Sequence, residues 1–380
     1  MSLLIEDSPR NLLAWIQQAI RAGTCAGAVI NPFASPWISK QHRRSAGEMA
    51  ERLHSLGAET WFDATTHALQ MPGVGDFRYY NEYSLWSGNA GDLSTPALMS
   101  DHIKRVYAVQ DEISATHLAP TTLLHYAESE TSLTALEFAE EALTIDPGTW
   151  LSIAGTASFW ASGAALDAHI AALAQLMPQG WFITTARPLS VLPAEAQKDE
   201  IEGICRSVRA LSEYAPIHVA YGDLAGLPAV AAGATSIGTG WDQRQRICGF
   251  GSFAGRDPDA DGGGWYKRPI LRALLGHLKV GEAAFLNNRD PARVRRLGSL
   301  PPSGPREAFF HYIAVLNAVV DSIASQPDYW HRYALLVELY EAAIIEWPVV
   351  QRITSARLGA DEWCTQLLDG LRAYGSGEGW

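Results

Sequence analysis

The sequence predicts an α/β protein whose parallel strands close into a (β/α)8 TIM-type barrel, followed by a helical C-terminal extension. Short apolar segments alternate with segments of helical periodicity along most of the chain, and this alternation is typical of a parallel sheet. Seven such strands can be recognised, more than the five or six of common open sheets. An eighth strand near 281–286 would close the barrel, and residues 306–371 have an almost continuous helical pattern.

The elements follow one another in the order that a barrel requires. The predicted strands lie at 26–30, 59–63, 118–125, 150–154, 181–185, 217–221 and 235–240. The predicted helices lie at 11–22, 45–56, 96–114, 132–143, 164–176, 195–214 and 224–232. In the second of these helices Ser45 and Glu48 have the spacing of a capping box, and Gly57 would end it. We therefore expect a barrel domain at 1–300 and, at 301–380, the last barrel helix with the helical extension.

A long stretch without a clear pattern, at 71–95, interrupts this alternation. It carries Tyr79, Tyr80, Tyr83 and Trp86. Loops of this length inside compact domains are usually functional. We interpret this one either as a lid over the barrel mouth or as a contact between subunits, so the question of an oligomer stays open.

Composition and charge restrict the function. The chain has 380 residues, of which 47% are hydrophobic, and a net charge of -12, which argues against a protein that coats nucleic acid by bulk electrostatics. Between Trp241 and Leu300, however, 11 Lys and Arg residues stand against 6 Asp and Glu residues. This basic stretch is either a phosphate-binding surface for a nucleic acid or nucleotide, or a solvated face.

The cysteines, the apolar runs and the N-terminus bear on metal binding and location. Cys25, Cys205, Cys248 and Cys364 lie far apart, so neither a zinc site nor a disulfide framework is predicted, and we expect no metal and no cofactor. The apolar runs are broken well before about 18 residues, so we expect no membrane span. The N-terminal residues lack the basic and apolar regions of a signal peptide. A cytoplasmic protein is the resulting expectation.

Polar residues follow almost every predicted strand. They are Asn31, Asp63, His125, Thr156, Arg187, Asp223 and Asp242, with His67 just beyond Asp63. In a (β/α)8 barrel the carboxyl ends of all strands meet at one mouth, where the reactive groups of such enzymes gather. The sequence therefore predicts a binding site at this mouth.

Several of these residues also have a purely structural interpretation. Asn31 precedes a proline and could cap a turn, while Asp223 could be the N-cap of the following helix. His67 and His125 could be partly buried histidines with satisfied hydrogen bonds. Arg187 could pair with a nearby carboxylate. For these residues both interpretations stay open.

Asp63 and Asp242 are the candidate catalytic pair, because both directly follow an apolar strand and neither opens an obvious helix. Two carboxyl groups in one cleft can divide labour: one attacks as a nucleophile, while the other, with a raised pKa, transfers protons. This arrangement suits cleavage at the anomeric carbon of a sugar.

The segment from Gly233 to Arg246 is the most informative part of the sequence. It places small residues before a strand that ends in Gly238-Thr-Gly240. Backbone N–H groups at such a strand end can approach a phosphate. Trp241 follows as a further candidate binding residue, and Arg244 and Arg246 could clamp phosphate oxygens.

At these positions the sequence resembles the tRNA-guanine transglycosylase superfamily, including its relatives that insert 7-deazaguanines into DNA. Two motifs carry the resemblance: Asp63-Ala-Thr-Thr-His-Ala-Leu-Gln70, and the segment from Gly233 to Arg246 with Asp242. The helical segment from Phe309 to Ala324, with Asn317 inside it, is similar to the family's closing helix. The resemblance implies a barrel fold in which Asp242 is the nucleophile and an arginine-containing loop follows it.

The chain also departs from this family. The cysteine-rich zinc motif downstream of the nucleophile is absent. The family's substrate-reading Asp and its Gln-Gly and Gly-Leu-Ala-Val-Gly segments have no clear match. The base specificity of the family is therefore not implied.

Three hypotheses about function follow, in order of preference. The first is a transglycosylase-like enzyme that exchanges or cleaves a base at an N-glycosidic bond of a nucleic acid or nucleotide, with Asp242 as nucleophile and Asp63 handling protons or reading the base. The second is a phosphate-binding lyase or isomerase that acts on a small metabolite. The third is a non-catalytic barrel whose helical tail, with Trp330 and Trp347, docks a partner.

Overall fold

The computed structural model describes residues 2–8, 12–41, 43–75, 77–189, 192, 194–255, 270–300, 304–355 and 362–380. At its centre lies a sheet of short parallel strands: β1 (Ser2–Glu6), β2 (Gly27–Ile30), β3 (Glu59–Phe62), β4 (Leu123–Leu124), β5 (Trp150–Thr156), β6 (Gly180–Arg187), β7 (Ile217–Ala220) and β8 (Ser236–Thr239). They are paired in the order β3-β2-β1-β8-β7-β6-β5-β4. Because the first strand pairs with both β2 and β8, the sheet curls round on itself. The predicted (β/α)8 barrel is confirmed.

The barrel closes between β3 and β4, where regular strand pairing is replaced by single bridges. Thr116 bridges Trp61 of β3, and Leu118 bridges Trp150 of β5. The Thr116 N–H donates to the Thr60 carbonyl over 3.3 Å. The segment 116–118 therefore takes the position of the fourth strand at its N-terminal end, before β4. It connects β3 on one side with β5 on the other.

A buried side chain completes this seam. The Gln110 amide nitrogen donates to the Phe62 and Leu118 carbonyls, each over 2.9 Å. Its amide oxygen accepts the Leu118 N–H over 3.2 Å. Gln110 lies on α3 (Pro96–Glu112), so a side chain of an outer helix takes the place of a strand ladder between β3 and β4.

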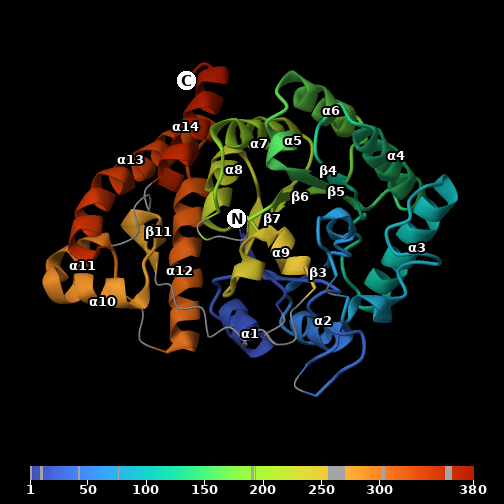
Figure 1. The fold of residues 1–380 in the computed structure, drawn as a ribbon, viewed down its shortest axis with the longest axis horizontal. Helices are drawn as coiled ribbons and strands as arrows, with labels where there is room; N and C mark the ends of the chain where they lie inside the picture. The colour runs from blue at the N-terminus through green and yellow to red at the C-terminus, as the bar shows by residue number, and fades with distance from the viewer. Residues whose placement is uncertain are drawn as a thin grey trace.

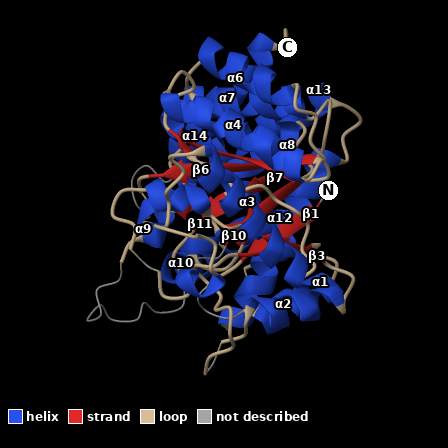
Figure 2. Cartoon of the chain, turned by 90° about the vertical axis from the view of Figure 1, so that its right-hand side faces the viewer, coloured by secondary structure: helices blue, strands red, loops and turns tan. Residues whose placement is uncertain are grey.

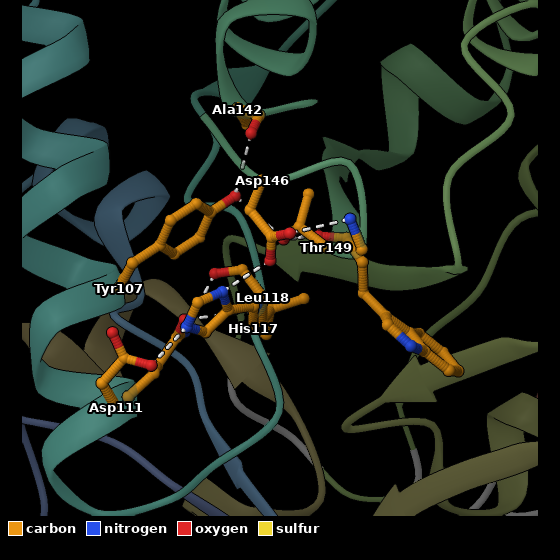
Figure 3. Close-up of polar contacts among 10 residues, drawn as sticks. Tyr107, Asp111, His117, Leu118, Ala142, Asp146 and Thr149 are labelled. Carbon is orange, nitrogen blue, oxygen red and sulfur yellow. Dashed lines mark hydrogen bonds and ion pairs between the residues drawn. The ribbon is translucent and has the colours of Figure 1, made fainter. Parts of the chain in front are cut away.

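A histidine between two carboxylates ties the seam to its surroundings at the N-terminal end of the strands (Figure 3). His117 Nδ1 lies 2.6 Å from Asp146 Oδ2, and Nε2 lies 3.0 Å from Asp111 Oδ1. The ring stacks on Tyr107 with 4.5 Å between the centroids. Tyr107 OH donates to Thr149 Oγ1 over 2.8 Å, which connects α3 to the start of β5.

Helices cover the outside of the barrel (Figures 1 and 2). Those that follow β1 to β7 in turn are α1 (Leu13–Arg21), α2 (Ala46–His54), α3, α4 (Glu130–Ile145), α6 (Ala164–Ala174), α7 (Lys198–Leu211) and α8 (Leu227–Ala232), with the short α5 (Ala157–Trp160) directly after β5. After β8 the place of the eighth helix is taken by α12 (Pro305–Ala324), which contacts β1, α1 and α8.

Short elements separate β8 from α12: β9 (Cys248–Gly249), α9 (Phe250–Phe253), the antiparallel pair β10 (Ile270–Leu271) and β11 (Gly276–His277), α10 (Val280–Arg289) and α11 (Pro291–Leu297). Beyond α12, α13 (Tyr329–Thr354) and α14 (Glu362–Gly377) pack on α8 and α7, on the same side of the molecule as α10 and α11 (Figure 1). Trp347 of α13 is buried and donates to the Leu274 carbonyl, whereas Trp330 is 49% exposed.

Local sequence accounts for the outer helices well. The predicted capping box of α2 is confirmed: the Ser45 hydroxyl accepts the Glu48 N–H over 3.2 Å, and the Glu48 carboxylate accepts the Ser45 N–H over 3.0 Å. Gly57 follows this helix with a φ of 65°, a conformation that glycine adopts without steric cost. The helix boundaries are therefore fixed by capping as well as by burial.

The eighth strand lies at the opposite end of the chain from its predicted position. The prediction of a strand at 281–286 is wrong, because these residues belong to α10. The buried Ala283 and Leu286 lie three residues apart, and Glu282 accepts the Lys279 N–H over 2.7 Å at the start of the helix. The missing strand is β1, a five-residue segment that was not recognised in the sequence.

One helix among the described residues, α12, is long and apolar enough to cross a membrane by length and composition. In the structure it packs on the barrel with its apolar side chains turned inward. Phe309, Ile313, Leu316 and Val320 are buried there. The apolar composition of α12 is therefore accounted for by its packing against the barrel.

Candidate functional site

A small pocket opens at the carboxyl ends of β1, β2, β7 and β8. It communicates with solvent, and the space of about 270 Å³ within its outline includes open solvent. Its lining combines an acid, an amide, a cation and several aromatic rings: Asp7, Asn31, Phe33, Ala34, Tyr221, Arg244, Ser252 and Phe253. Pockets of this position and mixed lining are typical of the active sites of (β/α)8 barrels.

Asp7 is the carboxyl group that faces this pocket. It directly follows β1 and is 5% exposed. One carboxyl oxygen, Oδ1, accepts the Ser8 N–H over 2.7 Å. Oδ2 has no hydrogen bond of ordinary geometry among the described residues, although the Ser35 side chain and the Asn31 N–H lie near enough to lower the pKa of Asp7. Burial raises the pKa of Asp7 to about 7, against the hydrogen bonds that lower it. Asp7 is thus divided between its protonated and ionised forms near neutral pH.

Two further carboxyl groups are buried at the same mouth, Glu6 at the end of β1 and Asp63 directly after β3. Each again has one oxygen, Glu6 Oε2 and Asp63 Oδ2, without a hydrogen-bond partner among the described residues. Burial raises the pKa of Glu6 to about 8, against the hydrogen bond from Tyr221. Burial also raises the pKa of Asp63 to about 7, and the nearby charge of Glu6 adds to this shift. Glu6 and Asp63 therefore interact, and Asp7 follows Glu6 directly in the chain.

A histidine and a cysteine lie beside these acids. His67, on the short turn after Asp63, is buried, and burial lowers its pKa to about 4. Its Nε2 lies 3.7 Å from the Sγ of Cys248, which is fully buried in β9. Burial and the charges of Asp63 and Glu6 raise the pKa of the Cys248 thiol. Both side chains are therefore neutral near pH 7.

The loop at 71–95 contacts the segment of α9 and Ala254 at this mouth. Val74 bridges Ala254, and the Gly75 N–H donates to the Phe253 carbonyl over 3.0 Å. Phe33 contacts both of these segments: its ring centroid lies 5.1 Å from that of Phe253 and 4.7 Å from that of Tyr80 in the loop. The loop therefore packs against residues of the pocket wall, and both of its interpretations, a lid and a contact between subunits, stay predictions.

Two of the predicted site residues line the pocket: Asn31, predicted from a strand end, and Arg244, predicted from the glycine-rich segment. The Asn31 side-chain oxygen accepts the N–H groups of Phe33 and Ala34, over 3.1 and 3.0 Å. Its interpretation as a turn cap is therefore confirmed, and the same turn carries Phe33 into the pocket wall. Asp63 and His67 lie at the mouth as predicted, although neither borders the pocket itself.

Asp242, the predicted nucleophile, stands at the rim and begins a short 3-10 turn. Its Oδ1 accepts the Arg244 N–H over 3.0 Å, and its Oδ2 accepts the Ser8 hydroxyl over 2.7 Å. The expectation that Asp242 opens no helical turn is therefore wrong. Both of its oxygens are used in anchoring the loop after β8 to the end of β1.

The other two predicted arginines are held in buried ion pairs. Arg187 donates to both carboxylate oxygens of Glu200 on α7, over 3.2 Å in one of the two contacts. Arg246 donates through Nε and Nη2 to Asp223 Oδ2, over 3.0 and 2.8 Å. The alternative for Arg187, an ion pair, is confirmed. The alternative for Asp223, a helix N-cap, is wrong, because its carboxylate binds Arg246 and caps no helix.

The two glycines at the end of β8 leave space that neighbouring side chains occupy. A Cβ on Gly238 would lie 1.9 Å from Glu6 Oε1, and a Cβ on Gly240 would lie 2.4 Å from the Gln245 side chain. Trp241 is buried on the outer side of the barrel, next to Trp15 and Phe309. Close packing therefore accounts for both glycines without a phosphate.

The remaining strand-end residues lie on the other side of the mouth. His125, after β4, is exposed. Thr156, at the end of β5, is buried, and its hydroxyl donates to the His125 carbonyl over 3.4 Å. Neither residue borders the pocket.

The basic stretch from Trp241 to Leu300 is only partly described, because residues 256–269 lie outside the described residues. Arg289, Arg295 and Arg296 are exposed on α10 and α11. Arg293 is instead paired with Asp290 over 3.1 Å and with Glu346. Part of the stretch is thus a solvated basic surface. Among the described residues no group of three or more His, Cys, Asp or Glu side chains is arranged to hold a metal ion.

Sequence reasoning missed Glu6 and Asp7, the acids at the end of β1. The signal was present: the apolar run Leu3-Leu4-Ile5 followed by two acids repeats the pattern of the other strand ends. It was missed because the run is short and lies at the N-terminus, where no preceding helix marks it as a strand.

Comparison with known proteins gives little further information. No protein-family model matches the chain, and no curated protein matches it. Among solved structures, a psychrophilic glycoside hydrolase family 10 endo-beta-1,4-xylanase is similar, with 10% sequence identity and a TM-score of 0.36. The similarity covers 62% of this chain and 85% of the xylanase chain. At this level of similarity, function has to be argued from the site.

Proposed function

We propose that this protein is an enzyme that cleaves or exchanges a group at a glycosidic bond, with Asp7 and Asp63 as its catalytic carboxyl groups. The observation that carries the proposal is the cluster of Glu6, Asp7 and Asp63, three buried acids that each have an oxygen without a hydrogen-bond partner among the described residues. Burying an unpaired carboxyl group costs stability. Such groups are concentrated at functional sites, where their raised pKa is used.

The two acids have the properties that this chemistry needs. A carboxyl group with a pKa of about 7 transfers protons efficiently at neutral pH. Asp7 faces the pocket and gives its proton to the leaving oxygen or nitrogen as the bond to the anomeric carbon breaks. The Asp63 carboxylate, at the same mouth but outside the pocket lining, stabilises through space the positive charge that develops at this carbon. Water or an incoming base then adds at the carbon and returns a proton to Asp7.

For the substrate we propose a nucleotide, free or within a nucleic acid. Arg244 at the pocket wall supports this choice, since guanidinium groups bind phosphate well. The pocket is small and opens to solvent, so a polymer would have to present a nucleotide that is turned out of its stack.

A second candidate is a lyase or isomerase that acts on a small anionic metabolite. Arg244 beside Asp7 favours it, because a cation and a proton-transferring acid in one small pocket suit such substrates. This reaction needs no carboxylate to stabilise an anomeric carbon. It would therefore depend on Asp7 and tolerate the loss of Asp63.

The test is release of a base from nucleosides, nucleotides and single-stranded oligonucleotides at pH 7, with aryl glycosides as a general probe. We expect Asp7→Asn and Asp63→Asn each to lower the rate by about 10²–10⁴-fold, the usual contribution of a catalytic acid or base. Asp242→Asn serves as the matched control, because its oxygens anchor a loop. We expect it to keep most of the activity.

Two results would change the assignment. Loss of activity in Asp242→Asn, in a protein that folds normally, would make Asp242 the nucleophile, as the sequence resemblance implies. Activity on small anionic metabolites that survives Asp63→Asn but not Asp7→Asn would favour the lyase or isomerase.

A further inference from the structure

The end of β7 is held in a backbone conformation that side chains disfavour. Tyr221 has a φ of 53°, and Asp223, two residues later, has a φ of 45°. Residues other than glycine rarely adopt this left-handed region, because the Cβ approaches the backbone. Such strain persists where the surroundings enforce it, and it is often found at functional sites. Tyr221 lines the pocket.

A carboxyl group from another strand holds this turn. The Tyr221 N–H donates to Glu6 Oε1 over 3.1 Å. In the sheet β8 lies between β1 and β7, so the Glu6 side chain reaches across β8 to make this contact. Gly238 of β8 leaves the space for it, because a Cβ there would lie 1.9 Å from Glu6 Oε1.

The fold does not need an acid at this place. Glu6 is fully buried, and the bond from Tyr221 satisfies only one of its oxygens among the described residues. His218 Nε2, 3.8 Å from Glu6 Oε1, also has no hydrogen-bond partner among them. An apolar side chain of the same length would avoid this desolvation. The contact with Tyr221 is what an apolar side chain could not provide.

We propose that Glu6 is a positioning residue, which holds Tyr221 in its left-handed conformation and thereby sets the part of the pocket wall that Tyr221 forms. Glu6 acts through Tyr221 and does not meet the substrate. Asp7 is the next residue in the chain. The end of β1 therefore positions two residues of the pocket lining, Asp7 through the backbone and Tyr221 through the Glu6 side chain. The effect on turnover rests on the proposed function, whereas the position of Tyr221 does not.

Hydrogen–deuterium exchange of the Tyr221 amide tests this proposal without any ligand. The amide of Val219, earlier in the same strand, is the internal reference. Glu6→Gln keeps an acceptor oxygen, and we expect the ratio of the Tyr221 and Val219 exchange rates to stay within about twofold of the wild-type ratio. Glu6→Met keeps the length but offers no acceptor, and we expect this ratio to rise about tenfold, as for the loss of a net hydrogen bond.

Two further variants complete the design. Gly238→Ala displaces the carboxyl group without removing it, and we expect it to raise the same ratio even if Glu6→Met fails to fold. Ser236→Ala is the control: its hydroxyl lies on β8 and contacts His218 Nδ1 over 2.8 Å, so the ratio should not change.

The proposal is overturned if Glu6→Gln and Glu6→Met raise the ratio equally, or if Tyr221 and Val219 lose protection by the same factor in both Glu6→Met and Gly238→Ala. A catalytic assay that shows no glycosidic activity would remove the proposed function but would leave this measurement unaffected.

Discussion

At the level of single residues, the mouth of the barrel is set apart by buried acids whose pKa values are raised. Glu6, Asp7 and Asp63 have pKa values raised to about 8, 7 and 7, against about 4 in an unfolded chain. They bind protons more tightly in the folded state, so their contribution to folding is fully present below pH ~4 and is lost as the pH rises through 7–8. The site is thus a source of instability at alkaline pH.

Buried histidines act in the opposite direction. Burial lowers the pKa of His67 to about 4 and that of His218 to about 3. Their neutral forms favour the folded state above pH ~6.5, and this contribution is lost as the pH falls through 6.5 towards 4. Between pH ~4 and ~6.5 these histidines therefore offset part of the destabilisation that the three acids cause, and above pH ~6.5 the acids lower the free energy of unfolding without this compensation.

The first prediction concerns Glu6→Gln. Because the amide cannot ionise, the variant avoids the cost of a buried carboxylate, while its oxygen can still accept the Tyr221 N–H. We expect its free energy of unfolding to exceed that of the wild type by an amount that grows with pH, by on the order of 2–4 kcal/mol between pH 5 and pH 9. Urea unfolding at several pH values measures this difference. A constant difference would show that Glu6 has an ordinary pKa.

At the level of elements, the barrel depends on one helix side chain at its seam. Regular pairing holds the sheet from β3 round to β4, but between these two strands Gln110 supplies hydrogen bonds that a ladder would otherwise make. Its partner Phe62 is the residue before Asp63. The seam therefore also fixes the position of Asp63 at the mouth of the barrel.

We predict that Gln110→Leu lowers the free energy of unfolding by about 2–4 kcal/mol, because it leaves buried backbone groups of Phe62 and Leu118 without partners. Chemical denaturation measures the loss. Gln175→Leu, at an exposed position after α6, is the control and should change stability little. Equal effects of the two substitutions would show that the seam is held by the strand bridges alone.

At the level of the whole molecule, buried ionic contacts join the barrel to the elements that follow it. Asp223, after β7, accepts hydrogen bonds from Arg246, the Thr239 hydroxyl and the Tyr312 hydroxyl of α12. Arg246 also contacts His277 of β11 and stacks over the Tyr312 ring, 4.2 Å from its centroid. The arginine predicted to bind phosphate is thus a structural link.

We predict that Arg246→Met costs about 3–5 kcal/mol, because it leaves the Asp223 carboxylate buried without its cation. Adding Asp223→Asn should recover part of this loss, since Asn is neutral and tolerates a positive φ. Arg293→Met is the matched control. Its ion pairs with Asp290 and Glu346 are more exposed, so its cost should stay below about 1 kcal/mol. Thermal and urea unfolding compare the three variants.

The sequence by itself determined the elements whose pattern is local. Helices such as α2 carry their capping residues and buried faces within one continuous segment, and the strands from β2 to β8 are apolar runs between turn signals. These signals act between neighbours in the chain, so the alternation of strands and helices, and with it the barrel, follows from the sequence. Strand β1 cannot be predicted in this way, because it is a run of three apolar residues with no helical segment before it to mark it as a strand.

Only the tertiary structure decided which polar residues share an environment. Asp63 and Asp242 look alike in the sequence, yet one is buried beside Glu6 with an oxygen that has no partner among the described residues, while the other is bound by Ser8 and the Arg244 N–H. Likewise, Arg246 and Arg244 are two residues apart, but only Arg244 lines the pocket. These differences depend on partners that are distant in sequence, and burial and pairing, which set a side chain's charge and role, arise only when the barrel closes.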